Sequence, residues 1–200
     1  SVKKKALIIE KQKNIKESLK FIINEFKKIE KPNNKILFDV ANFYKKTEKY
    51  EKSIEYYTRL INDLSLSTDI KSDLLYRRGG SYERIGMFEE ADIDLLNALK
   101  LNPNDPYILN YLAYSWLERN YKINEAIEML EKAYSLKNND PYIIDSIGWA
   151  YYLVNNYLKA EKFLKRAVEL MPDDPIVNDH YGDILWKLDR KIQARYFWKS

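Results

Sequence analysis

The groups in this chain that could take part in chemistry lie around its single histidine. Asp179 and Asp183 flank His180 on one expected helix, and Asp145 lies 35 residues earlier. Carboxylates and an imidazole can bind a metal ion or exchange protons. The chain holds no second histidine and no cysteine, and carboxylates on a solvated helix face are common. A metal-dependent enzyme is therefore only a minor alternative, and we expect no cofactor.

Two arginines give a second candidate site. Guanidinium groups pair well with carboxylates, so Arg77 and Arg84 could hold an acidic group. Other catalytic signatures are missing from the sequence. The pair Gly79-Gly80 lies inside an expected helix and does not form a phosphate loop, and no Ser/His/Asp order is recognisable as a triad. The sequence therefore predicts a protein that is not an enzyme.

The composition narrows the class of protein further. Hydrophobic residues make up 46% of the chain, while Gly and Pro number only 5 and 6, which is few for an all-β fold. The net charge is +4, and the Lys-rich residues 1–31 supply this surplus, which argues against a nucleic-acid partner. No apolar run reaches the ~20 residues that span a bilayer. The lack of cysteine excludes disulfides and fits either a cytoplasmic or a periplasmic, envelope-associated location.

A repeat of about 34 residues runs along the chain. The pair Asp-Pro occurs at 105–106, 140–141 and 174–175. Small residues recur in the same register, and we expect them to let neighbouring helices approach closely. These predicted packing residues form two series: Ala41, Gly79, Ala113, Gly148 and Gly182, and then Ala91, Ala126, Ala160 and Ala194.

Each repeat is predicted to form two helices. In residues 141–174, Ile144, Ile147, Gly148 and Tyr151 share one helical face. Asn155-Asn156 breaks this pattern, and a second amphipathic stretch follows and ends before Pro172. Two helices per repeat, stacked on the next pair, predict an all-α solenoid.

The pattern resembles the tetratricopeptide repeat: a large residue, then Leu-Gly-x2-Tyr, then Ala-x3-aromatic, then Pro. Residues 141–174 carry it at Ile144, Ile147, Gly148, Tyr151, Ala160, Leu164 and Pro172. The resemblance implies a right-handed superhelix of antiparallel helix hairpins, with about 12 helices. We place one continuous array in the chain: a partial hairpin at 1–33, a long first repeat at 34–71, repeats at 72–105, 106–140 and 141–174, and an incomplete fifth at 175–200.

The resemblance also implies a concave groove lined by the first helix of each repeat. One helical face of residues 141–153 is not occupied by the packing residues and carries Asp145, Trp149 and Tyr152. These three residues are our first candidates for partner contact. The predicted groove is rich in aromatic residues, although the same rings could instead pack inside a tightly curved superhelix. Its members are Asn42, Tyr76, Arg77, Arg84, Tyr107, Asn110, Tyr111, Tyr114, Tyr142, Asp145, Trp149, Tyr152, Asp179, Asp183 and Trp186.

A subset of tetratricopeptide proteins grips a C-terminal carboxylate with Lys and Asn side chains. The comparable helix positions of this chain hold Asn42, Arg77 and Arg84. Phe38 lies at the position where that clamp has lysine, so the match is partial. The stretches DSIGWAYY and NDHYGDILW resemble repeats of bacterial envelope-associated lipoproteins, some of which are adaptors that deliver substrates to a protease.

We therefore expect a bacterial, non-enzymatic scaffold that binds a protein or peptide in its groove. Self-association through terminal helices, with Tyr196-Phe197-Trp198 exposed, is the main alternative. A sugar or RNA ligand is a minor alternative, because the predicted groove carries several carboxylates. The chain stops six residues after Ala194, midway through an expected helix, so we expect it to come from a longer protein.

Overall fold

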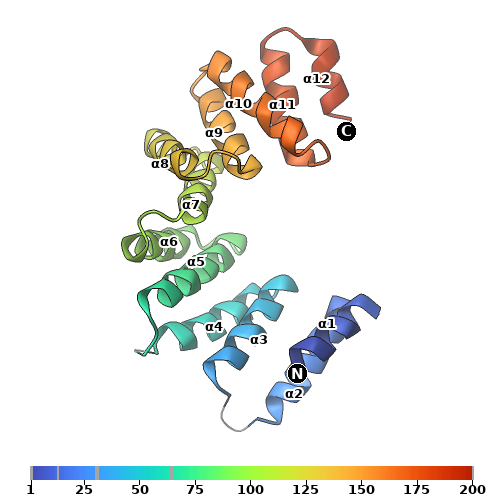
Figure 1. Ribbon diagram of the computed structural model, residues 1–200, viewed down its shortest axis with the longest axis vertical. Coiled ribbons are helices and arrows are strands. Elements are labelled where there is room, and N and C mark those ends of the chain that lie inside the picture. The colour runs from blue at the N-terminus through green and yellow to red at the C-terminus, as the bar shows by residue number, and fades with distance from the viewer. Residues whose placement is uncertain (1, 13, 30–31, 64, 200) are drawn as a thin grey trace. The chain divides into compact units, whose positions relative to one another are not determined.

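A computed structural model describes residues 2–12, 14–29, 32–63 and 65–199. These residues form twelve α-helices and no strand, which confirms the predicted all-α solenoid (Figure 1). The first six are α1 (Val2–Gln12), α2 (Ile15–Lys27), α3 (Asn34–Lys46), α4 (Tyr50–Ile61), α5 (Thr68–Arg84) and α6 (Phe88–Leu101). The other six are α7 (Pro106–Glu118), α8 (Ile123–Leu136), α9 (Pro141–Leu153), α10 (Tyr157–Leu170), α11 (Pro175–Lys187) and α12 (Lys191–Phe197).

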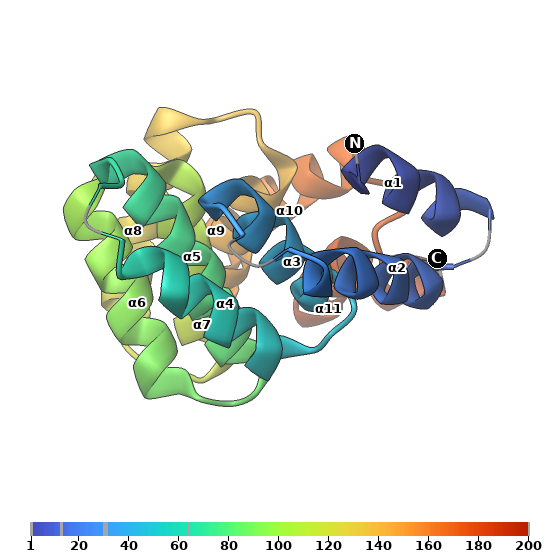
Figure 2. The ribbon, with the colours of Figure 1, turned by 90° about the horizontal axis from the view of Figure 1, so that it is seen from below.

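The chain forms two compact units, Ser1–Pro103 and Asn104–Ser200. In unit 1 the helices pack as the pairs α1 with α2, α3 with α4 and α5 with α6 (Figures 1 and 2). In unit 2 the pairs are α7 with α8, α9 with α10 and α11 with α12. Two helices per repeat are thus found in both units.

The Asp-Pro pairs begin the first helices of unit 2. Asp105, Asp140 and Asp174 are the N-caps of α7, α9 and α11, with proline in the first turn of each helix. The Asp174 carboxylate accepts hydrogen bonds from the backbone N–H groups of Ile176 and Val177 at 3.0 and 3.1 Å. Such caps satisfy amide groups that have no partner inside the helix.

The turn inside each described hairpin from α3 onward contains a residue with left-handed backbone geometry. These residues are Glu48, Gly86, Asn120, Asn155 and Asp189, with φ between 50° and 77°. The turn before α8 has a second such residue, Lys122. A left-handed residue after the last turn ends a helix and reverses the chain.

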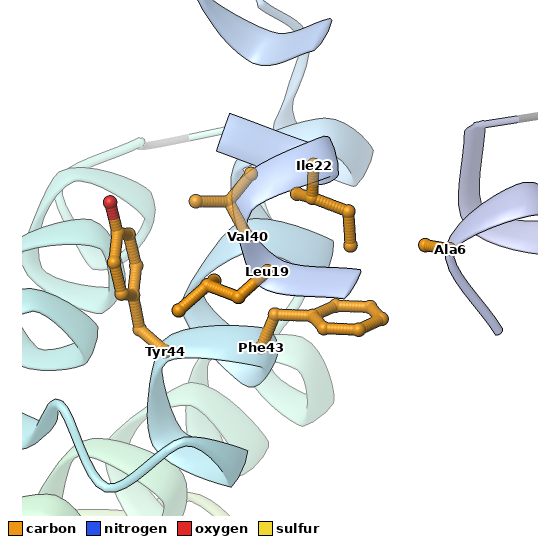
Figure 3. Packing of buried hydrophobic residues seen from close by; sticks show 6 residues of the cluster. All are labelled: Ala6, Leu19, Ile22, Val40, Phe43 and Tyr44. Carbon is orange, nitrogen blue, oxygen red and sulfur yellow. The ribbon is translucent and has the colours of Figure 1, made fainter. Parts of the chain in front are cut away.

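The N-terminal hairpin has its own apolar cluster with α3 (Figure 3). Ala6 of α1, Leu19 and Ile22 of α2, and Val40 and Phe43 of α3 are all buried. The Ser18 hydroxyl, also buried, donates a hydrogen bond to the Ala6 carbonyl oxygen at 2.7 Å. Helices α1 and α2 therefore pack as a pair like those that follow.

A buried ion pair joins the two helices of the third hairpin. Arg78 of α5 donates to both carboxylate oxygens of Asp94 of α6, at 2.7 and 2.8 Å. The side chains are only 17% and 4% exposed. Arg78 also donates to the Thr58 hydroxyl of α4 at 2.9 Å. This pair couples three helices of unit 1.

All nine predicted packing residues are buried. Gly148 shows why a small residue is required. A Cβ atom at this position would lie 2.8 Å from Cγ and Cδ2 of Leu164 on α10. The close approach of α9 and α10 thus leaves no room for a side chain there.

Candidate partner-binding site

Rings from three first helices meet in unit 2. We call Tyr114 of α7, Trp149 and Tyr152 of α9, and His180 of α11 the ring cluster. The Trp149 ring is stacked on the His180 ring, with centroids 4.2 Å apart and planes 11° from parallel. It is also stacked on Tyr152, at 4.8 Å and 11°. Tyr114 lies 6.4 Å from His180. The structure therefore brings two predicted groove residues, Tyr114 and Trp149, against the histidine, and places a third, Tyr152, against Trp149.

Asp145 and His180 form a buried hydrogen bond inside this cluster. His180 Nδ1 lies 2.9 Å from Asp145 Oδ2, and the residues are 7% and 4% exposed. This contact engages one of the two carboxylate oxygens of Asp145. Asp145 is therefore not exposed beside Trp149, and its contact with a partner stays a prediction that depends on its second oxygen, Oδ1. Its position on the helix faces the neighbouring α11, and the contact with His180 covers it.

Two acceptor oxygens on the first helices α7 and α9 have no partner among the described residues. They are Oδ1 of Asp145 and Oδ1 of Asn110, and both are buried from solvent. The two residues lie 35 positions apart, at nearly the same place in successive repeats. A buried acceptor without a donor is destabilising, so each oxygen favours a ligand or water that can donate.

The site combines low hydration with negative charge. Burial raises the pKa of Tyr114, and Glu118 and Asp145 raise it further by repulsion of the phenolate. Burial also raises the pKa of Tyr152, with Asp183 adding to the effect. The pKa of the Asp183 carboxyl is raised chiefly by burial too. These carboxylates make the site attractive to a cation, and Lys187 offsets the effect only in part at Asp183.

The remaining predicted groove residues differ in exposure. Tyr107, Tyr142 and Trp186 are 46%, 58% and 39% exposed. Asp179 and Arg84 are exposed as well. The half-buried members are Asn42, Tyr76, Arg77, Asn110, Tyr111, Tyr114, Trp149, Tyr152 and Asp183. Large exposed rings therefore occur on each of α7, α9 and α11.

In unit 1 the arginines are already engaged by neighbouring side chains. Arg77 donates to Asp73 at 2.8 Å and to the Asn42 side-chain oxygen at 3.3 Å, and it lies over the Phe38 ring. Arg84 lies over the Tyr50 ring instead. The side chains of Arg77 and Asn42 thus lie close together, as a carboxylate clamp requires. They are, however, hydrogen-bonded to each other.

Lys45 is a functional candidate that the sequence reading missed. Its ammonium lies beside Arg77 and donates to the Arg77 carbonyl oxygen at 3.1 Å. Burial lowers the pKa of Lys45 to about 8, and repulsion from Arg77 adds to this. Lys45 lies four residues after Ala41, as Tyr152 follows Gly148, and this repeat position was the available signal.

The Lys45 pKa predicts a pH-dependent stability. Between about pH 8 and the ordinary lysine value near 10.5, the folded chain binds fewer protons than the unfolded chain. The contribution of Lys45 to the free energy of unfolding therefore rises with pH between these two values. Denaturant unfolding at pH 7.5 and 10 should show wild type gaining stability relative to Lys45→Met. An equal difference at both pH values would contradict the assignment.

The alternative metal site has no geometric support. Among the described residues, no group of three or more His, Cys, Asp or Glu side chains is placed to hold a metal ion.

No helix among the described residues combines the length and apolarity that crossing a bilayer requires.

Comparison with known families identifies the repeat. The family model described as tetratricopeptide repeat matches residues 35–62, 72–105 and 143–174. A TPR repeat-containing protein of Pseudomonas aeruginosa is 32% identical over 111 residues, which cover 56% of this chain and 19% of that protein. The chain thus spans about a fifth of the length of this curated relative.

Solved structures share the fold. A tetratricopeptide repeat protein from Parabacteroides merdae has a TM-score of 0.74 at 15% identity, covering 98% of this chain and 75% of that one. MamA from Desulfovibrio magneticus has a TM-score of 0.69 at 19% identity, covering 83% of this chain and 91% of that one. At these identities the likeness concerns the fold alone.

Proposed function

We propose that this chain, whose repeats match the tetratricopeptide-repeat family model and a TPR repeat-containing relative, is a non-enzymatic scaffold that binds a segment of another protein on the first helices of unit 2. The fold supports the general role, since stacked hairpins hold side chains rigidly and reduce the entropy lost on binding. The partner surface is the row of rings on α7, α9 and α11.

The observation that carries this proposal is the exposure of large rings on the same three helices that form the ring cluster. Tyr107 begins α7, Tyr142 begins α9 and Trp186 lies near the end of α11, and each is more than a third exposed. Exposed aromatic side chains framed by polar groups are typical of binding hot spots. Trp149 and Tyr152, which are half-buried and stacked on each other, add a rigid pair of rings to α9.

Replacing Tyr142 by Ser and Trp186 by Ala should weaken partner binding at least tenfold, because hot-spot rings commonly contribute about 1.4 kcal/mol or more. Affinity capture from the native organism identifies the partner, and calorimetry then measures Kd for wild type and variant. The matched control is Leu158→Ser, which removes an exposed apolar side chain of α10. Equal affinity of wild type and the double variant would contradict the proposal.

Self-association is the second candidate, and one observation favours it. Ile192 and Tyr196 of α12 are 86% and 70% exposed and lie four residues apart, on one helical face. A second copy could cover this face. Light scattering across a concentration series should then show a dimer that Ile192→Lys converts to monomer. A monomer at every concentration would remove this candidate.

A further inference from the structure

We propose that unit 2 recognises an arginine side chain of the bound segment, whose guanidinium group enters the ring cluster beside Trp149 and is neutralised by Asp145 and Asp183. This inference rests on the proposed function and specifies the chemistry of the partner. It follows from three properties of the site, which are its acceptors, its charge and its flat rings.

The site has an excess of hydrogen-bond acceptors. Oδ1 of Asp145 is buried and has no donor among the described residues, and the same holds for Oδ1 of Asn110 at the equivalent position of the preceding repeat. His180 lies against the other carboxylate oxygen of Asp145, Oδ2, so Oδ1 is left to accept from a ligand. A guanidinium group brings five N–H donors in one plane and no acceptor, which complements this set.

The charge of the site also favours a cation. Asp145, Asp183 and Glu118 come from three different helices, and each raises the pKa of a tyrosine of the ring cluster, in addition to the effect of burial. Among these carboxylates, His180 is hydrogen-bonded to Asp145. Asp183 accepts a bond, at 3.2 Å, from the Trp198 indole N–H, and Lys187 partly offsets its raised pKa. A cation bound here would be attracted by carboxylates of all three helices.

The rings of the cluster select guanidinium over ammonium. The rings of Trp149, His180 and Tyr152 are nearly parallel, and Tyr114 lies at the side of His180. A planar guanidinium stacks on such faces, whereas a lysine ammonium is a compact and strongly hydrated charge. Since Asp145 is only 4% exposed, a cation contacts it only after a ring moves. Binding should therefore change the surroundings of the Trp149 indole.

The chain has four tryptophans, so its indole N–H groups can be followed individually by nuclear magnetic resonance. The full 15N-labelled chain is titrated with the peptide acetyl-Gly-Arg-Gly-amide at millimolar concentrations. Matched probes carry lysine, or citrulline, which has the shape of arginine without its charge. We expect a saturable shift of the Trp149 indole signal with the arginine peptide, a several-fold weaker response to lysine and none to citrulline.

Asp183→Asn should weaken binding of the arginine peptide about tenfold, while Asp179→Asn, an exposed charge on the same helix, should not. Glu118→Gln is the second variant if Asp183→Asn loses the dispersed spectrum of a folded chain. Equal response to citrulline or lysine, no response at all, or equal binding by the Asp183 and Asp179 variants would overturn the inference. If the arginine peptide fails but Tyr142→Ser with Trp186→Ala still weakens partner binding, the proposed function stands and only the arginine assignment is wrong.

Discussion

Asp94→Ala should destabilise unit 1 by about 3–5 kcal/mol, because it leaves the Arg78 guanidinium buried without its counterion. Both side chains are largely shielded from water, so neither can exchange the ion pair for hydration. The Thr58 hydroxyl remains as a partner of Arg78, but a neutral acceptor does not compensate a buried charge. Native-state hydrogen exchange should show the loss in α5 and α6.

Two further variants separate the ion pair from a general effect of charge. Glu90→Ala removes an exposed carboxylate from α6 and should change stability by less than about 1 kcal/mol. Replacing the pair together, as Arg78→Met with Asp94→Leu, should recover most of the loss, since an apolar pair leaves no unpaired charge. A loss below 1 kcal/mol for Asp94→Ala would show that Arg78 finds water instead.

Gly148→Leu should destabilise unit 2 by roughly 1–3 kcal/mol, because overfilling a close-packed helix contact forces the helices apart. The added Cβ would already meet two side-chain atoms of Leu164 and, at 3.1 Å, the Leu164 backbone nitrogen. A flexible side chain can turn away, but a backbone atom moves only if α10 moves. Denaturant unfolding followed by circular dichroism measures this loss.

The exposed position Lys165 on α10 provides the matched control for this experiment. Lys165→Leu adds a similar side chain where nothing is displaced, so its effect should stay within about 0.5 kcal/mol. Gly148→Ala should be milder than Gly148→Leu, because the gain in helix propensity of about 1 kcal/mol offsets part of the crowding. Unchanged stability of Gly148→Leu would mean that Gly148 has no packing role.

The helices, their capping residues and the family could be predicted because the signals that determine them are local and repeat along the chain. Asp174 followed by Pro175 specifies a helix start by itself. The spacing of Gly148 and its equivalents indicates where the two helices of a hairpin meet. The same periodicity identified the face of α9 that carries Trp149 and Tyr152, and the structure places these two rings side by side.

Only the tertiary structure showed which side chains of neighbouring helices touch. Helical periodicity gives the direction of Asp145 on α9 but not its distance from α11, so it did not predict that His180 covers this carboxylate. For the same reason Arg78 and Asp94 are unremarkable charges in the sequence and a buried ion pair in the fold. The sequence by itself thus determined the repeat and its helices. The distances between those helices decided which polar groups are buried, paired or left for a ligand.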